Sequence, residues 1–188
     1  MAKKRKLETN TTRELFDLCY NADSRENEKA WRQLRQWLSF YQNDRQRFKE
    51  AAAYPNTFNW TPLHVLVSRS PPLDVVETLV KHAPETLRMK TVEGDLPLHI
   101  ACGQRASPEI IKILVAAYPE SVRVTNNAGG LPLHFACYNR HSLDVLNLLL
   151  QVYPESIHVE CVTRTGENLQ PSELLKNKNQ FDSDDENE

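Results

Sequence analysis

One short phrase recurs along the chain at a constant interval. It reads Thr-Pro-Leu-His at residues 61–64 and Leu-Pro-Leu-His at residues 96–99 and 131–134, so it returns every 35 residues. A fixed period of this size predicts a stack of copies of one supersecondary unit, because a single copy is too small to bury its apolar face alone. Such stacks offer long surfaces and few closed pockets, which favours binding of other macromolecules over catalysis.

Each copy carries the same signals in the same order. The proline of the phrase suits the first turn of a helix, where a missing N–H costs nothing. A second helix is indicated by apolar residues at helical spacing, such as Ile111 and Leu114. A proline disfavours helical geometry in the residue before it, and we expect the second helices to stop at Pro84, Pro119 and Pro154.

One position in the polar segment that follows predicts a special backbone conformation. Asn59, Gly94 and Gly129 occupy this position at intervals of 35 residues. Glycine and asparagine accept left-handed backbone more readily than other residues. We therefore expect a turn with positive φ there in every copy.

These copies resemble the ankyrin repeat, whose phrase is Thr-Pro-Leu-His-x-Ala and whose usual period is 33 residues. The resemblance implies an all-α, ankyrin-type solenoid of stacked helix-turn-helix repeats with projecting hairpin loops. The chain departs from the family pattern in its longer period and in two positions. Arg105 and Arg140 stand where the family usually has glycine between the helices, and Leu96 and Leu131 replace the threonine of the phrase.

We divide the chain into seven predicted segments, with caps at both ends because terminal repeats need a polar outer face. The segments are, in order, a basic disordered tail (1–10), a helical cap or degenerate repeat (11–55), three ankyrin repeats (56–94, 95–129 and 130–165), a capping helix (166–177) and an acidic disordered tail (178–188).

Charge and composition limit the partners. The 188-residue chain has a formal net charge of −2, so it lacks the basic excess that neutralises nucleic-acid phosphates. No secretory signal or spanning apolar segment is recognisable, and four cysteines in such a chain indicate reduced thiols. We expect a monomeric cytoplasmic or nuclear protein that does not bind membranes.

The two ends of the chain carry opposite charge. Lys3, Lys4, Arg5 and Lys6 form either a nuclear import signal or a solvated basic start. Ser183 lies among acidic residues at the other end and is a candidate for phosphorylation.

The repeated histidines, His64, His99 and His134, invite a metal hypothesis that geometry argues against. Equivalent residues of stacked helices lie about 8–10 Å apart, whereas zinc ligands lie about 2 Å from the ion. We expect each imidazole to bridge backbone groups of the hairpin and the helix instead. Cys102 and Cys137 follow two of these histidines by three residues. Because no third group orients such a pair, and a buried cysteine acts as a small hydrophobe, we predict neither catalysis nor a cofactor.

The resemblance implies that partners contact the hairpin tips and the exposed side of the first helices. Aromatic and arginine side chains carry most interface energy, so Phe58, Trp60, Arg69 and Tyr138 are favoured; the alternative for Phe58 and Trp60 is packing against segment 11–55. The complete candidate set is Phe58, Trp60, Val92, Glu93, Asp95, Asn126 and Asn127 at the tips, and Ser68, Arg69, Gln104, Tyr138 and Asn139 on the helices, beside the structural residues Pro62, His64, Pro97, His99, Pro132 and His134.

The sequence as a whole predicts a non-enzymatic protein–protein interaction module, a scaffold or adaptor that binds a protein partner. The alternative is a nuclear regulatory protein that associates with nucleic acid or chromatin through the basic amino-terminal arm.

Overall fold

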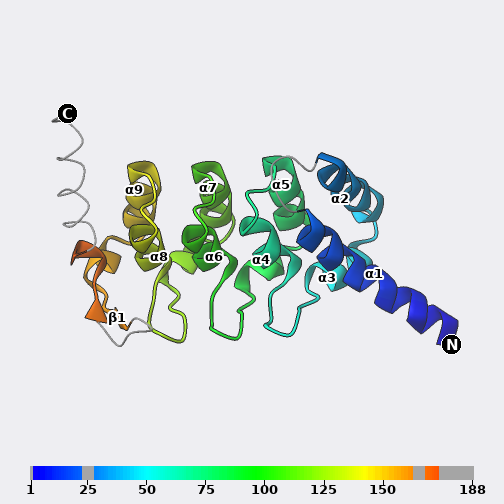
Figure 1. Ribbon diagram of the computed structural model, residues 1–188, viewed down its shortest axis with the longest axis horizontal. Helices are drawn as coiled ribbons and strands as arrows, with labels where there is room; N and C mark the ends of the chain where they lie inside the picture. The colour runs from blue at the N-terminus through cyan, green and yellow to red at the C-terminus, as the bar shows by residue number, and fades with distance from the viewer. Residues whose placement is uncertain (1, 23–27, 163–167, 174–188) are drawn as a thin grey trace.

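The protein is a row of helix pairs that stand side by side (Figure 1). Its structure is a computed structural model that describes residues 2–22, 28–162 and 168–173. Three pairs follow the predicted pattern, each with an inner helix that begins in the repeated phrase and an outer helix that follows it. The pairs are α4 (Pro62–Val67) with α5 (Leu73–His82), α6 (Pro97–Gly103) with α7 (Pro108–Ala117), and α8 (Pro132–Tyr138) with α9 (Leu143–Val152). The predicted all-α solenoid is confirmed.

The boundaries of the helices follow from a few residues. Proline occupies the first position of every inner helix, as predicted. Ser107 caps α7, where its hydroxyl oxygen accepts a hydrogen bond from the N–H of Ile110 (3.4 Å). Each outer helix ends just before a proline. That proline opens a short 3₁₀ helix, a feature that the sequence did not predict: η1 (Pro84–Arg88), η2 (Pro119–Arg123) and η3 (Pro154–His158).

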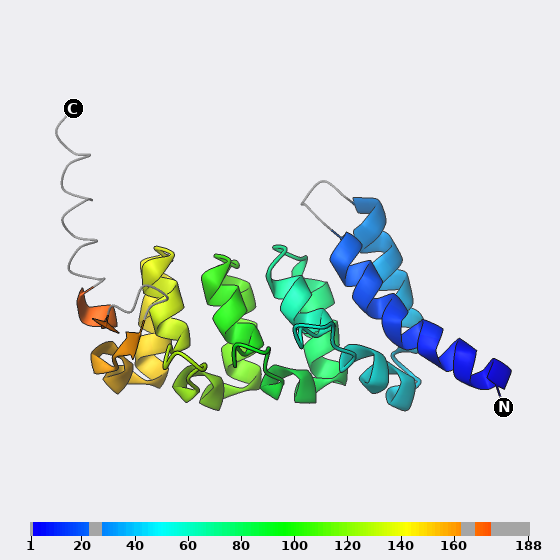
Figure 2. The same cartoon turned by 60° about the horizontal axis from the view of Figure 1, so that its bottom comes forward.

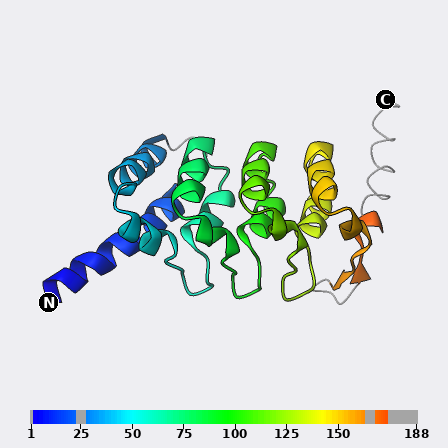
Figure 3. The same ribbon diagram turned by 180° about the vertical axis from the view of Figure 1, so that it is seen from behind.

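A hairpin precedes each inner helix: the first lies directly before α4, and the other two connect η1 to α6 and η2 to α8. The three hairpins project from the same side of the stack in the front and back views (Figures 1 and 3). Asn59, Gly94 and Gly129 have φ values of 58°, 81° and 79°, so the predicted turn with positive φ is confirmed. A second column also has positive φ, between the two helices of each pair: Ser70 (52°), Arg105 (55°) and Arg140 (53°).

The amino-terminal cap contains three helices, one more than a repeat pair: α1 (Ala2–Asn21), α2 (Glu28–Tyr41) and α3 (Arg45–Ala52). The predicted disordered tail at residues 1–10 is wrong from Ala2 onward, because α1 begins there and includes Lys3, Lys4, Arg5 and Lys6. Residues 3–8 are mostly strong helix formers, and they extend a helix that is anchored by the buried Leu15 and Cys19. Figure 2 shows the first turns of α1 projecting beyond the stack.

Charged contacts join the cap to the first helix pair. Arg35 of α2 donates two hydrogen bonds to the carboxylate of Asp74 on α5, at 2.7 and 3.1 Å. These bonds lower the pKa of the Asp74 carboxyl. Lys49 of α3 pairs with Glu85 of η1 at 3.2 Å. The cap is thereby tied to both ends of α5.

Within the predicted capping helix (166–177), residues 168 and 169 are extended instead of helical. Strand β2 (Asn168–Leu169) instead pairs antiparallel with β1 (Cys161–Val162). The buried Pro171 then opens a helical turn, and the N–H of Gln170 donates to Glu173 (3.4 Å). The rest of that predicted helix, the acidic tail and Ser183 lie outside the described residues.

A single apolar core runs the length of the stack. It extends from Leu15 in the cap to Leu149 in α9 without interruption. The outer helices contribute their buried stripes, such as Val75, Val76 and Leu79 of α5. Each pair thus covers the apolar face of its neighbour, as the period of 35 residues predicts.

Candidate interaction surface

The tips of the three hairpins have the same backbone conformation. We define the tips as residues 56–60, 91–95 and 126–130. In each tip the first residue donates its N–H to the carbonyl of the fifth, at 2.9–3.0 Å, and accepts from the N–H of the fourth at 3.0 Å. The second and third residues therefore occupy the two central positions of a β-turn. Equivalent backbone N–H and C=O groups of the three tips therefore point in the same direction.

A polar side chain at the first position of each tip stabilises these turns, and the sequence analysis did not identify it. The Asn56 side-chain oxygen accepts hydrogen bonds from the N–H groups of Phe58 and Trp60, each at 2.9 Å. Asn126 does the same for Ala128 and Gly130, at 3.1 and 2.8 Å. The available signal was the recurrence of a short polar side chain at 35-residue intervals, since such side chains hydrogen-bond their own backbone in turns.

Neighbouring tips are hydrogen-bonded to one another. The N–H of Val92 donates to the carbonyl of Phe58 (3.1 Å), and the N–H of Asn127 donates to the carbonyl of Glu93 (2.9 Å). The side chain of Asn127 adds a bond to the carbonyl of Val92 (2.9 Å). We call the resulting row of residues 56–60, 91–95 and 126–130 the tip strip.

The repeated histidines hold each hairpin to the next. In every copy Nδ1 accepts the N–H of the residue three positions earlier, at 3.0–3.1 Å. Nε2 faces a carbonyl of the segment that follows the next 3₁₀ helix: Asp95 for His64, Gly130 for His99 and Val159 for His134, at 3.2, 3.1 and 2.8 Å. Leucine in the first position of the phrase preserves the backbone bond, and only Thr61 adds its hydroxyl (2.8 Å).

Burial keeps two of these imidazoles neutral. It lowers the pKa of His64 and of His99 from 6.5 to about 4, against the smaller opposing effect of the backbone carbonyls. Burial also raises the pKa of the Cys102 thiol, so the reactive thiolate is disfavoured. Both ring nitrogens of His99 already face backbone groups, so His99 does not serve as a base for Cys102. Among the described residues, no three histidine, cysteine or acidic side chains come together as metal ligands would.

The predicted partner-binding residues divide into two groups. Large parts of Phe58, Val92 and Tyr138 are exposed, at 59%, 48% and 70%, and Glu93, Gln104 and Asn127 are exposed as well. The other candidates are partly buried: Trp60, Ser68, Arg69, Asp95, Asn126 and Asn139.

Most of the partly buried candidates have contacts within the protein. Trp60 packs against the core with its ring 6.2 Å from that of His64. The guanidinium of Arg69 lies 5.2 Å from the ring of Tyr20 in the cap, and Asp95 accepts a hydrogen bond from the Asn126 side chain (2.9 Å). Ser68 and Asn139 donate to carbonyls of their own helices. These contacts favour a structural contribution for this group.

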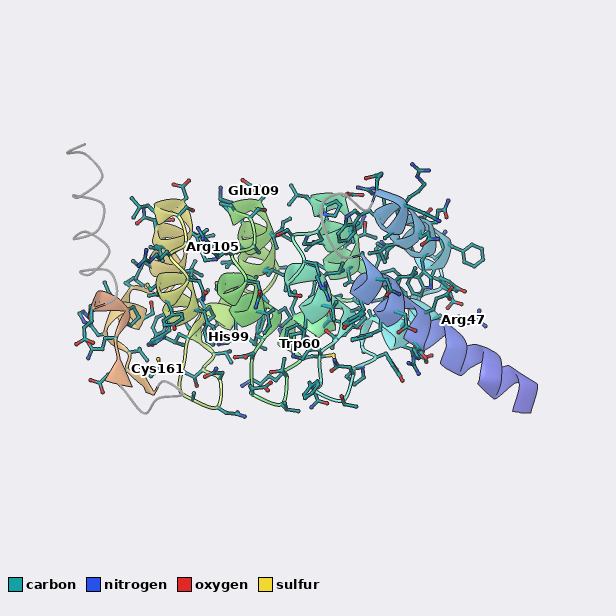
Figure 4. The ribbon with its side chains drawn as sticks, viewed as in Figure 1. Arg47, Trp60, His99, Arg105, Glu109 and Cys161 are labelled. Atoms are coloured by element: carbon teal, nitrogen blue, oxygen red, sulfur yellow. The ribbon has the colours of Figure 1, made fainter. Side chains whose placement is uncertain are left out.

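The exposed candidates lie in two places on the stack. Trp60 and His99 lie low on the stack, where the hairpins leave the inner helices, and Arg105 lies above them (Figure 4). Tyr138 is the last residue of α8, at the end of that helix away from the tips. Inner helices of 6 or 7 residues are about 10 Å long. The tips and the ends of the inner helices are thus separated by roughly two turns of helix.

A second inter-repeat contact was also missed by the sequence reading. Arg88 of η1 lies over the ring of Tyr118 (4.8 Å), and Arg123 of η2 lies over Tyr153 (4.3 Å). Each arginine thus stacks on the tyrosine that ends the outer helix of the next pair. This repeated contact gives a structural reason for the tyrosine that precedes Pro119 and Pro154.

Comparison with known families agrees with this geometry. A family model described as ankyrin repeats, three copies, matches residues 71–161. Residues 71–161 are therefore similar to ankyrin repeats, and repeats of this family are in general protein–protein interaction modules. No curated protein matches the chain.

Among the described residues, none of the helices combines the length and the apolar character needed to cross a bilayer.

Proposed function

We propose that this protein is a non-enzymatic adaptor that binds a protein partner through the tip strip and the exposed ends of the inner helices. The observation that carries the proposal is the exposure of Phe58, Val92 and Tyr138 at positions where neighbouring repeats differ. Large apolar side chains on a water-exposed surface supply binding energy when a partner covers them. The repeated prolines and histidines meanwhile keep the surface in one shape.

Several candidate residues already make contacts inside the protein, so fewer residues are free to contribute affinity for a partner. Trp60, Arg69, Asp95 and Asn126 are occupied by intramolecular contacts. We therefore assign affinity to Phe58 and Val92 on adjacent tips and to Tyr138 on α8. A partner that touches all three extends from the tips to the far edge of the inner helices.

Affinity capture with the full chain as bait tests the proposal. Proteins captured by the unmodified chain should be lost, or at least tenfold depleted, when Phe58, Val92 and Tyr138 are all replaced by alanine. Phe40→Ala is the matched control, because Phe40 is 76% exposed but lies on α2, outside the proposed surface. Equal capture by the triple variant and by the control would exclude this surface.

A further inference from the structure

The tip strip has an open amino-terminal edge. Val92 and Asn127 each donate the N–H of the first central turn position to the preceding tip. Thr57 holds the same position in the first tip, and its N–H points the same way because the three tips share one conformation. The first hairpin is the outermost of the row at that end (Figures 1 and 3). Within the described part of the chain, no hairpin precedes it.

The side chains around this edge are apolar and exposed. Thr57 is exposed, the adjacent Phe58 is 59% exposed, and Tyr54 is 39% exposed. An open backbone donor beside an exposed aromatic side chain offers an extended peptide the same two contacts as a sheet edge does in strand addition: a backbone hydrogen bond and apolar contact from the side chain.

We propose that Thr57 and Phe58 bind an extended, apolar segment of the partner protein, which continues the row of hydrogen bonds between neighbouring tips. A carbonyl of the segment accepts the N–H of Thr57, as the carbonyl of Phe58 accepts that of Val92 at 3.1 Å. A neighbouring apolar side chain of the segment covers Phe58 and Tyr54. The occupant follows from continuity with the tip-to-tip bonds already present in the protein. This inference rests on the proposed function and names the part of the partner that the tip strip binds.

The turn allows a substitution that removes only the donor. Proline lacks a backbone N–H and is favoured at the first central position of a β-turn, which is the position of Thr57. Thr57→Pro should therefore fold normally and lose the proposed bond, whereas Thr57→Ala keeps the N–H and is the matched control. Val92→Pro makes the same change where the N–H is bonded to Phe58, so it should lower the thermal midpoint while Thr57→Pro does not.

The probe is a phage-displayed library of random linear 12-residue peptides, selected on the full chain. Recovered peptides should bind Thr57→Pro about three- to tenfold more weakly than Thr57→Ala, the range expected for one net hydrogen bond. They should also lose affinity for Phe58→Ala. Failure to recover peptides, or equal affinity for the two Thr57 variants, would overturn the inference.

A measurement on the unmodified chain covers the case in which Thr57→Pro does not fold. On titration with a recovered peptide, the amide proton of Thr57 should shift downfield in NMR spectra, and an unchanged signal would exclude the bond. Self-association that depends on Thr57, measured by sedimentation, would make a second copy the occupant and also overturn the inference. If Thr57→Pro captures the natural partner as well as Thr57→Ala does, while the Phe58, Val92 and Tyr138 triple variant does not capture it, the inference fails and the proposed function stands.

Discussion

The buried imidazoles of His64 and His99 should make the stability of the stack depend on pH between 7 and 5. Both have a pKa of about 4 in the folded protein, against 6.5 for an unperturbed histidine. As the pH falls below 6.5, the unfolded chain takes up protons at these residues before the folded protein does. Stability is thus fully present above about pH 6.5 and is lost progressively as the pH falls toward 4.

The magnitude follows from the two pKa values. A residue whose pKa is 6.5 unfolded and about 4 folded lowers the free energy of unfolding by about 2 kcal/mol between pH 7 and pH 5. Two such residues lower it by about 4 kcal/mol, which is a large part of the roughly 5–15 kcal/mol typical of a folded domain.

Urea unfolding at pH 7, 6 and 5, followed by circular dichroism at 222 nm and tryptophan fluorescence, measures this loss. His99→Gln is the internal control. It should be less stable than the unmodified chain at pH 7, yet lose only about half as much free energy between pH 7 and pH 5. A free energy of unfolding that changes by less than about 1 kcal/mol over this range in the unmodified chain would refute the reasoning.

Four further substitutions test the repeat geometry and the contact of the cap by thermal or urea unfolding. Gly94→Ala should destabilise more than Gly129→Ala. Both glycines have positive φ, but a Cβ on Gly94 would lie 2.5 Å from the Asn127 side chain while one on Gly129 has no neighbour closer than 3.7 Å; equal losses would contradict the tip packing. Arg105→Gly should raise the free energy of unfolding by about 1 kcal/mol, since it relieves left-handed backbone at a non-glycine residue, and a loss of stability would count against that conformation. Arg35→Gln should cost about 0.5–1 kcal/mol at low ionic strength and almost nothing in 1 M salt; a salt-independent cost would mean that the ion pair is not its source.

The repeating part of the fold was predictable because the same residue types recur at equivalent positions in three copies. The prolines of the phrase, the apolar stripes and the Asn59, Gly94 and Gly129 column each state a local backbone requirement. A requirement that recurs every 35 residues is distinguishable from chance. The positive φ values at those three positions confirm the interpretation.

The ends of the chain were less predictable because their sequence patterns are not repeated elsewhere in the chain. Nothing in the polar run before Leu15 separates a solvated tail from an extension of α1, since strong helix formers suit both. The strand pair depends on Cys161 and Leu169 pairing although they are eight residues apart, which a search for helical spacing does not detect. In both places tertiary context decides between locally similar conformations.

The candidate surface was predictable in outline but not in detail. Position in the repeat placed Phe58, Val92 and Tyr138 on the outside, and each is exposed. It did not separate these residues from Arg69, whose guanidinium lies over Tyr20, because the cap that supplies Tyr20 has no counterpart in the repeats. Contacts between a repeat and a unique segment leave no periodic signal.

Hydrogen exchange with and without a captured partner tests the central claim most directly. If the partner covers the tips and the inner-helix ends, amide exchange should slow in the tip strip and near Tyr138, while the outer faces of α5, α7 and α9 remain unchanged. Protection confined to the outer helices or to α2, with exchange in the tips unaltered, would contradict the account.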